Sequence, residues 1–229
     1  MKCIITIIFT CVFASAISAQ QNKFNIGIEG GPSLINLRGN GLGFTPDASI
    51  GFAGGLTFQY NFPKLLSLRT NIGYERKGAI LSNILFTDAN GQTLGTTTLH
   101  FNFDYFTMPI MLRANFGKKV NFFLNGGIYF GYLIQQKTNS DGTAGLPIPS
   151  SEDNTSNYYR FDTGVALGLG CEVPIKNKIV LSFELRNNTG LYNVVEPIMY
   201  YSPNLKTSST NLLIGIAYKF GTRISDEES

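Results

Sequence analysis

The sequence predicts an all-β protein, a single eight-stranded antiparallel up-and-down transmembrane β-barrel with short periplasmic turns and long extracellular loops. Eight segments alternate apolar and polar residues with a period of two, as half-buried strands do. Short and long connections also alternate strictly between these segments. The composition agrees, with 13% aromatic residues, 14% charged residues and 25 Gly among 229 residues. Charged residues make up about 25% of a typical soluble domain.

This composition excludes a coiled coil and a highly charged disordered chain. The length suits one domain at about 100–200 residues per domain. The formal net charge is only +3, so no nucleic-acid partner is expected.

Residues 1–19 are predicted to be a secretory signal peptide, which leaves residues 20–229 as the barrel domain. Lys2 precedes a short apolar core, and the segment ends in small residues before Ala19. A buried N-terminal helix is the alternative, but the apolar core is too short to span a membrane. Cys171 is the one cysteine of the expected mature chain, so no internal disulfide is expected there.

The eight predicted strands follow from the alternation. They are residues 24–36, 50–62, 65–78, 98–116, 120–136, 157–174, 178–192 and 207–220. The sixth is the clearest, because Leu167 and Leu169 lie on one face while Gly168 and Gly170 lie on the other. In the fourth, Phe101 and Phe103 are out of phase with Phe106 and the apolar residues after it, which predicts a bulge near Asp104 or an effect of Pro109.

The connections predict which end of the barrel faces the periplasm. Short connections fall at residues 63–64, 117–119 and 174–178. Long polar connections fall at residues 37–49, 79–97, 137–156 and 193–206. Outer-membrane barrels have short periplasmic turns and long extracellular loops. Eight strands therefore place both chain ends in the periplasm.

Alternation alone does not say whether the apolar face meets lipid or fills a soluble lipocalin-like barrel, and three features favour lipid. The polar face is rich in glycine, which suits a narrow interior. Its charges nearly balance and can form ion pairs in a lumen. The lumen ion-pair candidates are Glu29, Glu75, Asp162, Glu172, Glu184, Arg69, Lys77, Arg113, Arg160, Arg186 and Lys219.

The third feature is that aromatic residues gather near the predicted strand ends, as in the girdles of membrane barrels. The turn-end set is Tyr60, Phe62, Phe116, Phe122, Tyr218 and Phe220, and the loop-end set is Tyr74, Tyr132, Tyr159 and Tyr192. Outer-membrane lipids are therefore the expected surroundings. Eight strands leave a lumen just wide enough for side chains, so no open pore is expected.

Several short stretches resemble the PorT-like outer-membrane β-barrel family of Bacteroidetes. They are GIEGG at 27–31, GYERKGA at 73–79, YFTMPIMLR at 105–113, NGGIYFGY at 125–132 and RFDTGVALG at 160–168. The resemblance covers residues 24–220 and implies a Gram-negative outer-membrane protein. The family's namesake is linked to type IX protein secretion, which implies envelope or secretion-machinery proteins as possible partners through the long loops.

The sequence predicts no catalytic, cofactor-binding or metal site, and no enzyme. His100 is the one histidine, and Asp104 lies four residues later on the same predicted strand face, but no nucleophile motif accompanies them. The main hypothesis is therefore a structural or interaction protein of the outer membrane. The alternatives are an accessory of protein secretion or envelope assembly, a His100-dependent enzyme and a soluble periplasmic ligand-binding barrel.

Overall fold

The computed structural model describes residues 24–39, 45–62, 65–117, 119–141, 149–176, 178–196 and 204–220. The predicted signal peptide at residues 1–19 lies outside these ranges, as does the C-terminal tail at 221–229. Among the described residues, no helix is long and apolar enough to cross a membrane.

Nine strands and one short 3₁₀ helix make up the described secondary structure. They are β1 (Phe24–Arg38), β2 (Ser49–Asn61), β3 (Leu66–Thr87), β4 (Thr93–Phe116), β5 (Asn121–Ser140), β6 (Ser151–Asp153), η1 (Thr155–Asn157), β7 (Phe161–Lys176), β8 (Ile179–Gly190) and β9 (Lys206–Phe220).

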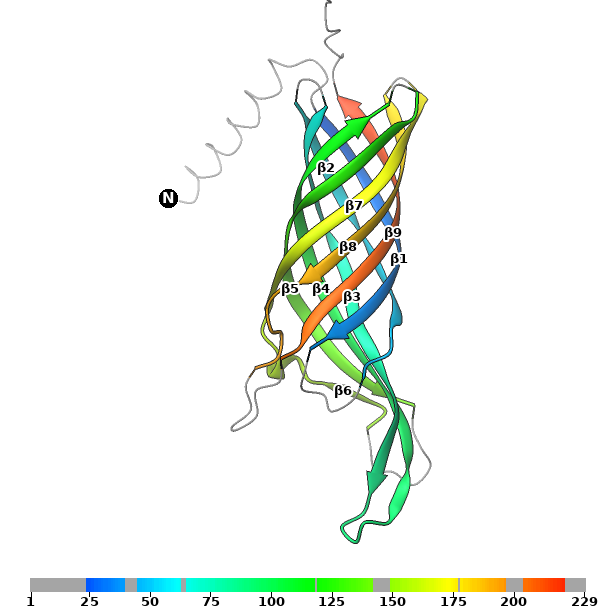
Figure 1. Cartoon of the computed structure of the whole chain (residues 1–229), viewed down its shortest axis with the longest axis vertical. Coiled ribbons are helices and arrows are strands. Elements are labelled where there is room, and N and C mark those ends of the chain that lie inside the picture. The colour runs from blue at the N-terminus through cyan, green and yellow to red at the C-terminus, as the bar shows by residue number, and fades with distance from the viewer. Residues whose placement is uncertain are drawn as a thin grey trace, which may run out of the picture.

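Eight of these strands close into a ring, in the order β1, β2, β3, β4, β5, β7, β8, β9 and back to β1. Every neighbouring pair is antiparallel, and the pairing of β1 with β9 joins Phe24 to Phe220. Figure 1 shows the strands tilted around the barrel axis, with both ends of the described chain at the same rim. The predicted fold class is confirmed.

The largest difference from the predicted strands is a hairpin that extends past the barrel. Residues 79–97 were predicted to be a long polar loop, but β3 and β4 continue through most of this segment and pair as far as Thr87 and Thr93. The prediction was wrong because β-branched residues such as Ile80, Ile84 and Thr97 sustain pairing without a strict polar alternation. In Figure 1 the hairpin projects well beyond the rim.

The tip of this hairpin is held by its own backbone and by one carboxylate. Asp88 Oδ1 accepts hydrogen bonds from the backbone N–H groups of Asn90 (2.9 Å) and Gln92 (2.8 Å). Gly91 has a φ of +81°, a conformation that other residues rarely adopt. The tip is therefore an ordered turn.

The loop after β5 also contains a strand that the sequence pattern did not indicate. β5 runs on to Ser140, and the three-residue β6 pairs with it beside Lys137 and Asn139. The predicted sixth strand began at residue 157, whereas β7 begins at Phe161 after the short helix η1. These additions lie at the long-loop end, where β3, β4, β5 and β6 form an extension of the sheet.

A register shift occurs between Asp104 and Tyr105, where a bulge was predicted. The extra residue lies in the neighbouring strand, because Asp104 pairs with Gln135 and Tyr105 with Leu133. β4 itself keeps its alternation, and Phe103 is fully buried on the lumen side. Phe101 and Phe103 are therefore out of phase because they fill the lumen.

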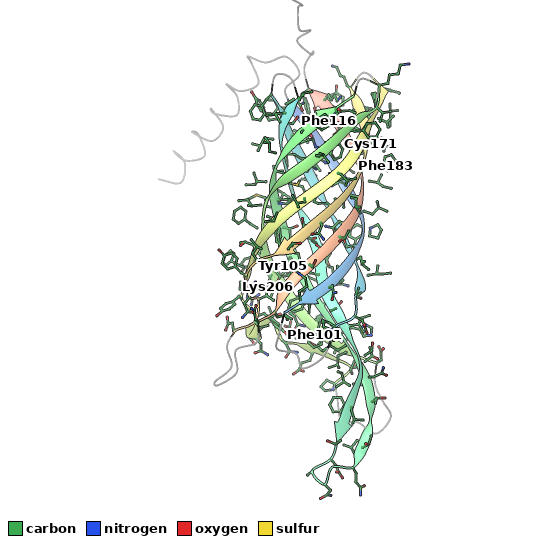
Figure 2. All side chains as sticks on the ribbon, viewed as in Figure 1. Phe101, Tyr105, Phe116, Cys171, Phe183 and Lys206 are labelled. Atoms are coloured by element: carbon green, nitrogen blue, oxygen red, sulfur yellow. The ribbon has the colours of Figure 1, made fainter. Side chains whose placement is uncertain are left out.

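The outer face of the barrel is apolar and the inner face is polar. Leu167 is 59% exposed and Leu169 is 56% exposed, whereas Glu184 and Arg186 are 2% and 3% exposed. A soluble ligand-binding barrel would have the opposite arrangement, since burying charges and exposing leucine to water both cost free energy. Phe183, which Figure 2 labels on β8, is 40% exposed and belongs to the outer face.

The predicted aromatic girdles lie on the outer surface. At the turn end, ring centroids of Phe24 and Tyr60 are 5.1 Å apart, and those of Tyr218 and Phe220 are also 5.1 Å apart. At the long-loop end, Tyr132 and Phe161 form a similar pair at 5.4 Å. Aromatic rings at two levels mark the two interfaces of a membrane with its hydrocarbon region between them.

Lumen-facing glycines leave room for large neighbours. A Cβ atom built on Gly168 would lie 2.9 Å from Oε1 of Glu184, and one on Gly170 would lie 2.5 Å from the Phe123 ring. Side chains from other strands therefore occupy the space that these glycines leave.

Leu167→Arg should destabilise the inserted barrel by about 2–4 kcal/mol if the side chain lies near the bilayer midplane. Leu167→Ile, which keeps the apolar surface, is the matched control. The free energy of unfolding in phospholipid vesicles, measured by urea titration and heat-modifiable gel migration, checks this. Equal stability of the two variants would contradict the outward orientation of Leu167.

Candidate functional site

Nine of the eleven predicted lumen charges are buried inside the barrel. They are Glu29, Arg69, Glu75, Lys77, Arg113, Asp162, Glu172, Glu184 and Arg186. β1, β3, β4, β7 and β8 supply them, because lumen-facing positions recur at every second residue of each strand. Together they form a central network, a lysine–aspartate pair and a separate glutamate.

The central network joins three arginines to three glutamates. Arg186 bridges Glu184 (Nε to Oε1, 2.6 Å) and Glu29 (Nη2 to Oε1, 2.8 Å). Arg69 Nη2 is 2.5 Å from Glu29 Oε2. Arg113 donates to Glu172 and also lies 3.3 Å from Glu184. The charges come from five strands, so the network ties opposite walls of the barrel together.

Neutral side chains complete the hydrogen bonding of this network. Asn125 accepts a hydrogen bond from Arg113 Nε (2.8 Å) and donates one to Glu184 (2.9 Å). Asn71 donates to Glu29 (2.9 Å). The guanidinium carbon of Arg113 lies 3.5 Å from the centroid of the Phe123 ring, a cation–π geometry. Buried charges need such partners, because the lumen offers little water to replace them.

The lysine–aspartate pair lies nearer the long-loop end. Lys77 Nζ donates to Asp162 Oδ2 at 2.9 Å, and both side chains are fully buried. Tyr129 (3.0 Å) and Thr207 (2.6 Å) donate to the same carboxylate oxygen. The Tyr129 ring also lies 3.9 Å from Lys77 Nζ, so the ammonium is held by an anion and an aromatic face.

Glu75 is buried with neutral donors and makes no ion pair within the described ranges. Its Oε1 accepts hydrogen bonds from Ser209 Oγ (2.5 Å), Asn211 Nδ2 (2.8 Å) and Asn188 Nδ2 (2.9 Å). The carbonyl oxygens of both asparagines have no hydrogen-bond partner. The nine buried charges thus comprise five carboxylates and four cations, and Glu75 is the carboxylate without a cationic partner.

Arg160 was predicted to face the lumen, and this was wrong. It precedes β7, is exposed, and donates to the backbone carbonyl oxygens of Leu133 (3.2 Å) and Ile134 (3.4 Å). The alternation at its position had been extended past the true start of the strand at Phe161.

Lys219 was also predicted to pair in the lumen, but the described residues give it no ion pair. It is half-buried next to the last residue of β9, at the turn end of the barrel. Its position on the strand has the lumen-facing parity, but a lysine so near the rim can extend its ammonium into solvent.

The long-loop end of the lumen is closed by apolar side chains that the sequence reading did not identify. The cluster is Leu37, Ala79, Phe103, Tyr105, Leu133, Val194, Val195 and Leu205. Val194 and Val195 follow β8 and Leu205 precedes β9, so the described ends of this connection cover the mouth of the lumen. The out-of-phase Phe103 was the sequence signal for this apolar cap. Figure 2 labels Tyr105 within it.

Polar uncharged side chains fill the turn end of the lumen. Asn61 Oδ1 accepts hydrogen bonds from Gln59 (2.7 Å) and Ser67 (2.9 Å), and Asn115 donates to Ser67 (2.9 Å). The lumen is thus occupied along its length, by an apolar cap, a charged middle and an amide-rich base. The side chains of the described residues leave no wide passage for a solute.

His100 and Asp104 do not meet. Four residues of a strand span about 13 Å, and Asp104 instead pairs with Arg76 (2.7 Å) and accepts a hydrogen bond from Tyr74 (2.5 Å). His100 Nε2 lies 3.1 Å from both carboxylate oxygens of Asp141, just after β5. The described residues contain no group of three His, Cys, Asp or Glu side chains suited to a metal ion.

Glu184→Gln should destabilise the barrel by about 3–5 kcal/mol, because three buried arginines then share only the carboxylates of Glu29 and Glu172. The free energy of unfolding in detergent micelles, followed by circular dichroism, measures the change.

Glu75→Gln is the contrasting variant, with an expected change of about 1 kcal/mol or less. The carbonyl oxygens of Asn188 and Asn211 lack hydrogen-bond partners and are available as acceptors for the new amide, and no salt bridge of the described residues is lost. Similar losses in the two glutamine variants would show that Glu75 also neutralises a cation.

A family model agrees with this architecture. No curated protein matches the sequence. Among solved structures, similar chains include Ail of Yersinia pestis (15% identity, 88% of this chain and 100% of that chain, TM-score 0.45). Neisserial surface protein A (15%, 86% and 97%, 0.47) and OprG of Pseudomonas aeruginosa (12%, 90% and 100%, 0.45) are also similar. A model of the outer membrane protein beta-barrel domain matches residues 18–196, so the chain belongs to this family of outer-membrane β-barrel proteins.

Proposed function

We propose that this protein is a structural or interaction protein of the Gram-negative outer membrane, with a closed lumen and a contact surface at its long-loop end. The single observation that supports it best is the filled lumen, in which Arg113, Arg186 and Lys77 are all buried and paired. The side chains in the lumen stabilise the barrel and fill its interior, so only the exposed ends are accessible for contacts with other molecules.

Hydrogen bonds order the described part of the long-loop end into a surface. β6 adds to β5, and Asp153 accepts hydrogen bonds from the backbone of Thr155 (3.0 Å) and from Gln135 (2.7 Å). Together with the Thr155 hydroxyl, these donors lower the pKa of Asp153 to about 2, so it stays ionised. An ordered, charged surface of this kind suits contacts with proteins or surface polymers.

Planar-bilayer recordings test the closed lumen. The purified protein should show no discrete conductance steps at a concentration where a sixteen-stranded porin, the positive control, shows them. Stable steps that scale with the concentration of this protein would contradict a plugged lumen.

The enzyme alternative has one candidate residue, His100, whose neighbour Asp141 lies on a partly exposed surface. Ser140 precedes Asp141 in the chain, but its hydroxyl donates to the carbonyl oxygen of Pro149 (2.9 Å) and not to this pair, so we propose that the protein is not an enzyme. His100→Ala should leave the lipids and proteins of the envelope unchanged. An altered lipid profile in that strain, restored by the wild-type gene, would support the enzyme instead.

We also propose that residues 1–19 are a signal peptide through which the protein is exported. We further propose that the chain belongs to the PorT-like family. The ordered stretches between Gly27 and Gly168 support this membership, and the long-loop surface offers a site for a secretion or envelope-assembly partner. Comparison of the secreted proteins of a deletion strain and its parent tests the secretion role. Unchanged secretion would reject the secretion role, and the structural or interaction role would remain as the proposal.

A further inference from the structure

The charges of the described residues divide unevenly along the barrel axis. The long-loop end carries seven carboxylates and five cations. These are Asp47, Asp88, Asp104, Asp141, Glu152, Asp153 and Glu196, with Arg38, Arg76, Lys137, Arg160 and Lys206. The lumen carries five carboxylates and four cations. The turn end has four lysines and, within the described ranges, no carboxylate outside the lumen.

We name these four lysines, Lys119, Lys176, Lys178 and Lys219, the lysine collar. Lys119 lies in the turn between β4 and β5, and Lys176 and Lys178 lie at the turn between β7 and β8. The backbone N–H of Lys219 donates to the carbonyl oxygen of Lys178 at 2.7 Å, which joins the end of β9 to that turn. The collar thus follows one continuous arc of the rim, from β4 round to β9.

The collar lies at the level where a membrane presents its headgroups. Lys178 Nζ is 5.9 Å from the centroid of the Tyr218 ring, and Tyr218 pairs with Phe220 in the aromatic girdle. Aromatic rings of such girdles sit beside the headgroups, and lysines near them extend their ammonium groups outward. Figure 2 labels Phe116, the last residue of β4, at the same end of the barrel.

We propose that the lysine collar binds the phosphate groups of anionic phospholipids in the leaflet that the turns meet. Three of the four lysines are exposed, and no salt bridge involves any of the four within the described ranges. Basic side chains at a membrane surface favour anionic lipids. The opposite end carries an excess of carboxylates, so it repels phosphate. This inference rests on the proposed membrane placement and adds a lipid preference to it.

Native mass spectrometry of the detergent-purified full chain tests this preference. Phosphatidylglycerol and phosphatidylcholine are added in equal amounts, and the number of molecules of each that stays bound is counted. Lys176→Gln with Lys178→Gln is the collar variant, and Lys137→Gln with Lys206→Gln removes the same charge from the other end. Lys176→Arg with Lys178→Arg keeps the charge of the collar.

The wild type, the arginine variant and the long-loop variant should retain phosphatidylglycerol preferentially. The collar variant should lose this preference by about fivefold for each lysine removed. Heat-modifiable migration of each variant shows separately whether the barrel is folded, so loss of the barrel is distinguished from loss of lipid selection. An equal loss in the collar and long-loop variants would overturn the inference, because it would mean unspecific attraction.

The acidic tail of the chain provides a second way to overturn the inference. Residues 226–228 are Asp-Glu-Glu, and they follow the collar in sequence. If the wild type shows no preference but a variant lacking these residues does, the tail rather than lipid occupies the collar. Preference in both forms supports lipid binding.

Discussion

Ions buried in the lumen must find partners there, and this requirement governs the rest of the structure. The outer face is apolar, so polar side chains of the strands turn inward into a space only a few side chains wide. Charges in such a space are stable only when ion pairs or several hydrogen bonds replace their contacts with water. Arg186 forms ion pairs with Glu29 and Glu184, and the pair with Glu29 connects strands β8 and β1, which are far apart in sequence.

The same requirement explains the layered interior. In the middle of the lumen, ion pairs and asparagine amides fill the space. At the turn end amides and hydroxyls suffice, and at the long-loop end a connecting segment brings Val194 and Val195 over Phe103. The apolar cap excludes water from the Lys77–Asp162 pair, which strengthens that attraction because fewer water molecules screen it. Glycines such as Gly168 keep the wall close enough for Glu184 to reach its partners.

The alternation of the chain was sufficient to predict the ring of strands and the direction in which Leu167 and Gly168 point. A period-two pattern shows which residues share a face of the strand, because lipid-facing side chains are apolar and lumen-facing side chains are polar. The sequence did not predict which residue pairs with each buried ion, because the pairing depends on the register between strands. Arg113 contacts Glu172 and Glu184 only after bulges and strand tilt have fixed how the walls align.

Pattern reading failed where the membrane no longer dictates the pattern. Beyond the rim, the two faces of the β3–β4 hairpin do not contact lipid and lumen. Its apolar–polar alternation is therefore weak, and the sequence pattern of this segment resembled that of a loop. Arg160 was misplaced for the same reason, because it precedes the strand to which it was assigned. His100 and Asp104 share a parity, but strand rise separates them by about 13 Å.

The hairpin that extends past the rim is structurally independent of the lumen. Among the described residues, the outermost ones on either side of Asp88 pair only with each other, so substitutions or insertions at the tip leave the described lumen contacts intact. The tip of the hairpin is therefore a place where the sequence of this protein can change while the barrel below stays the same.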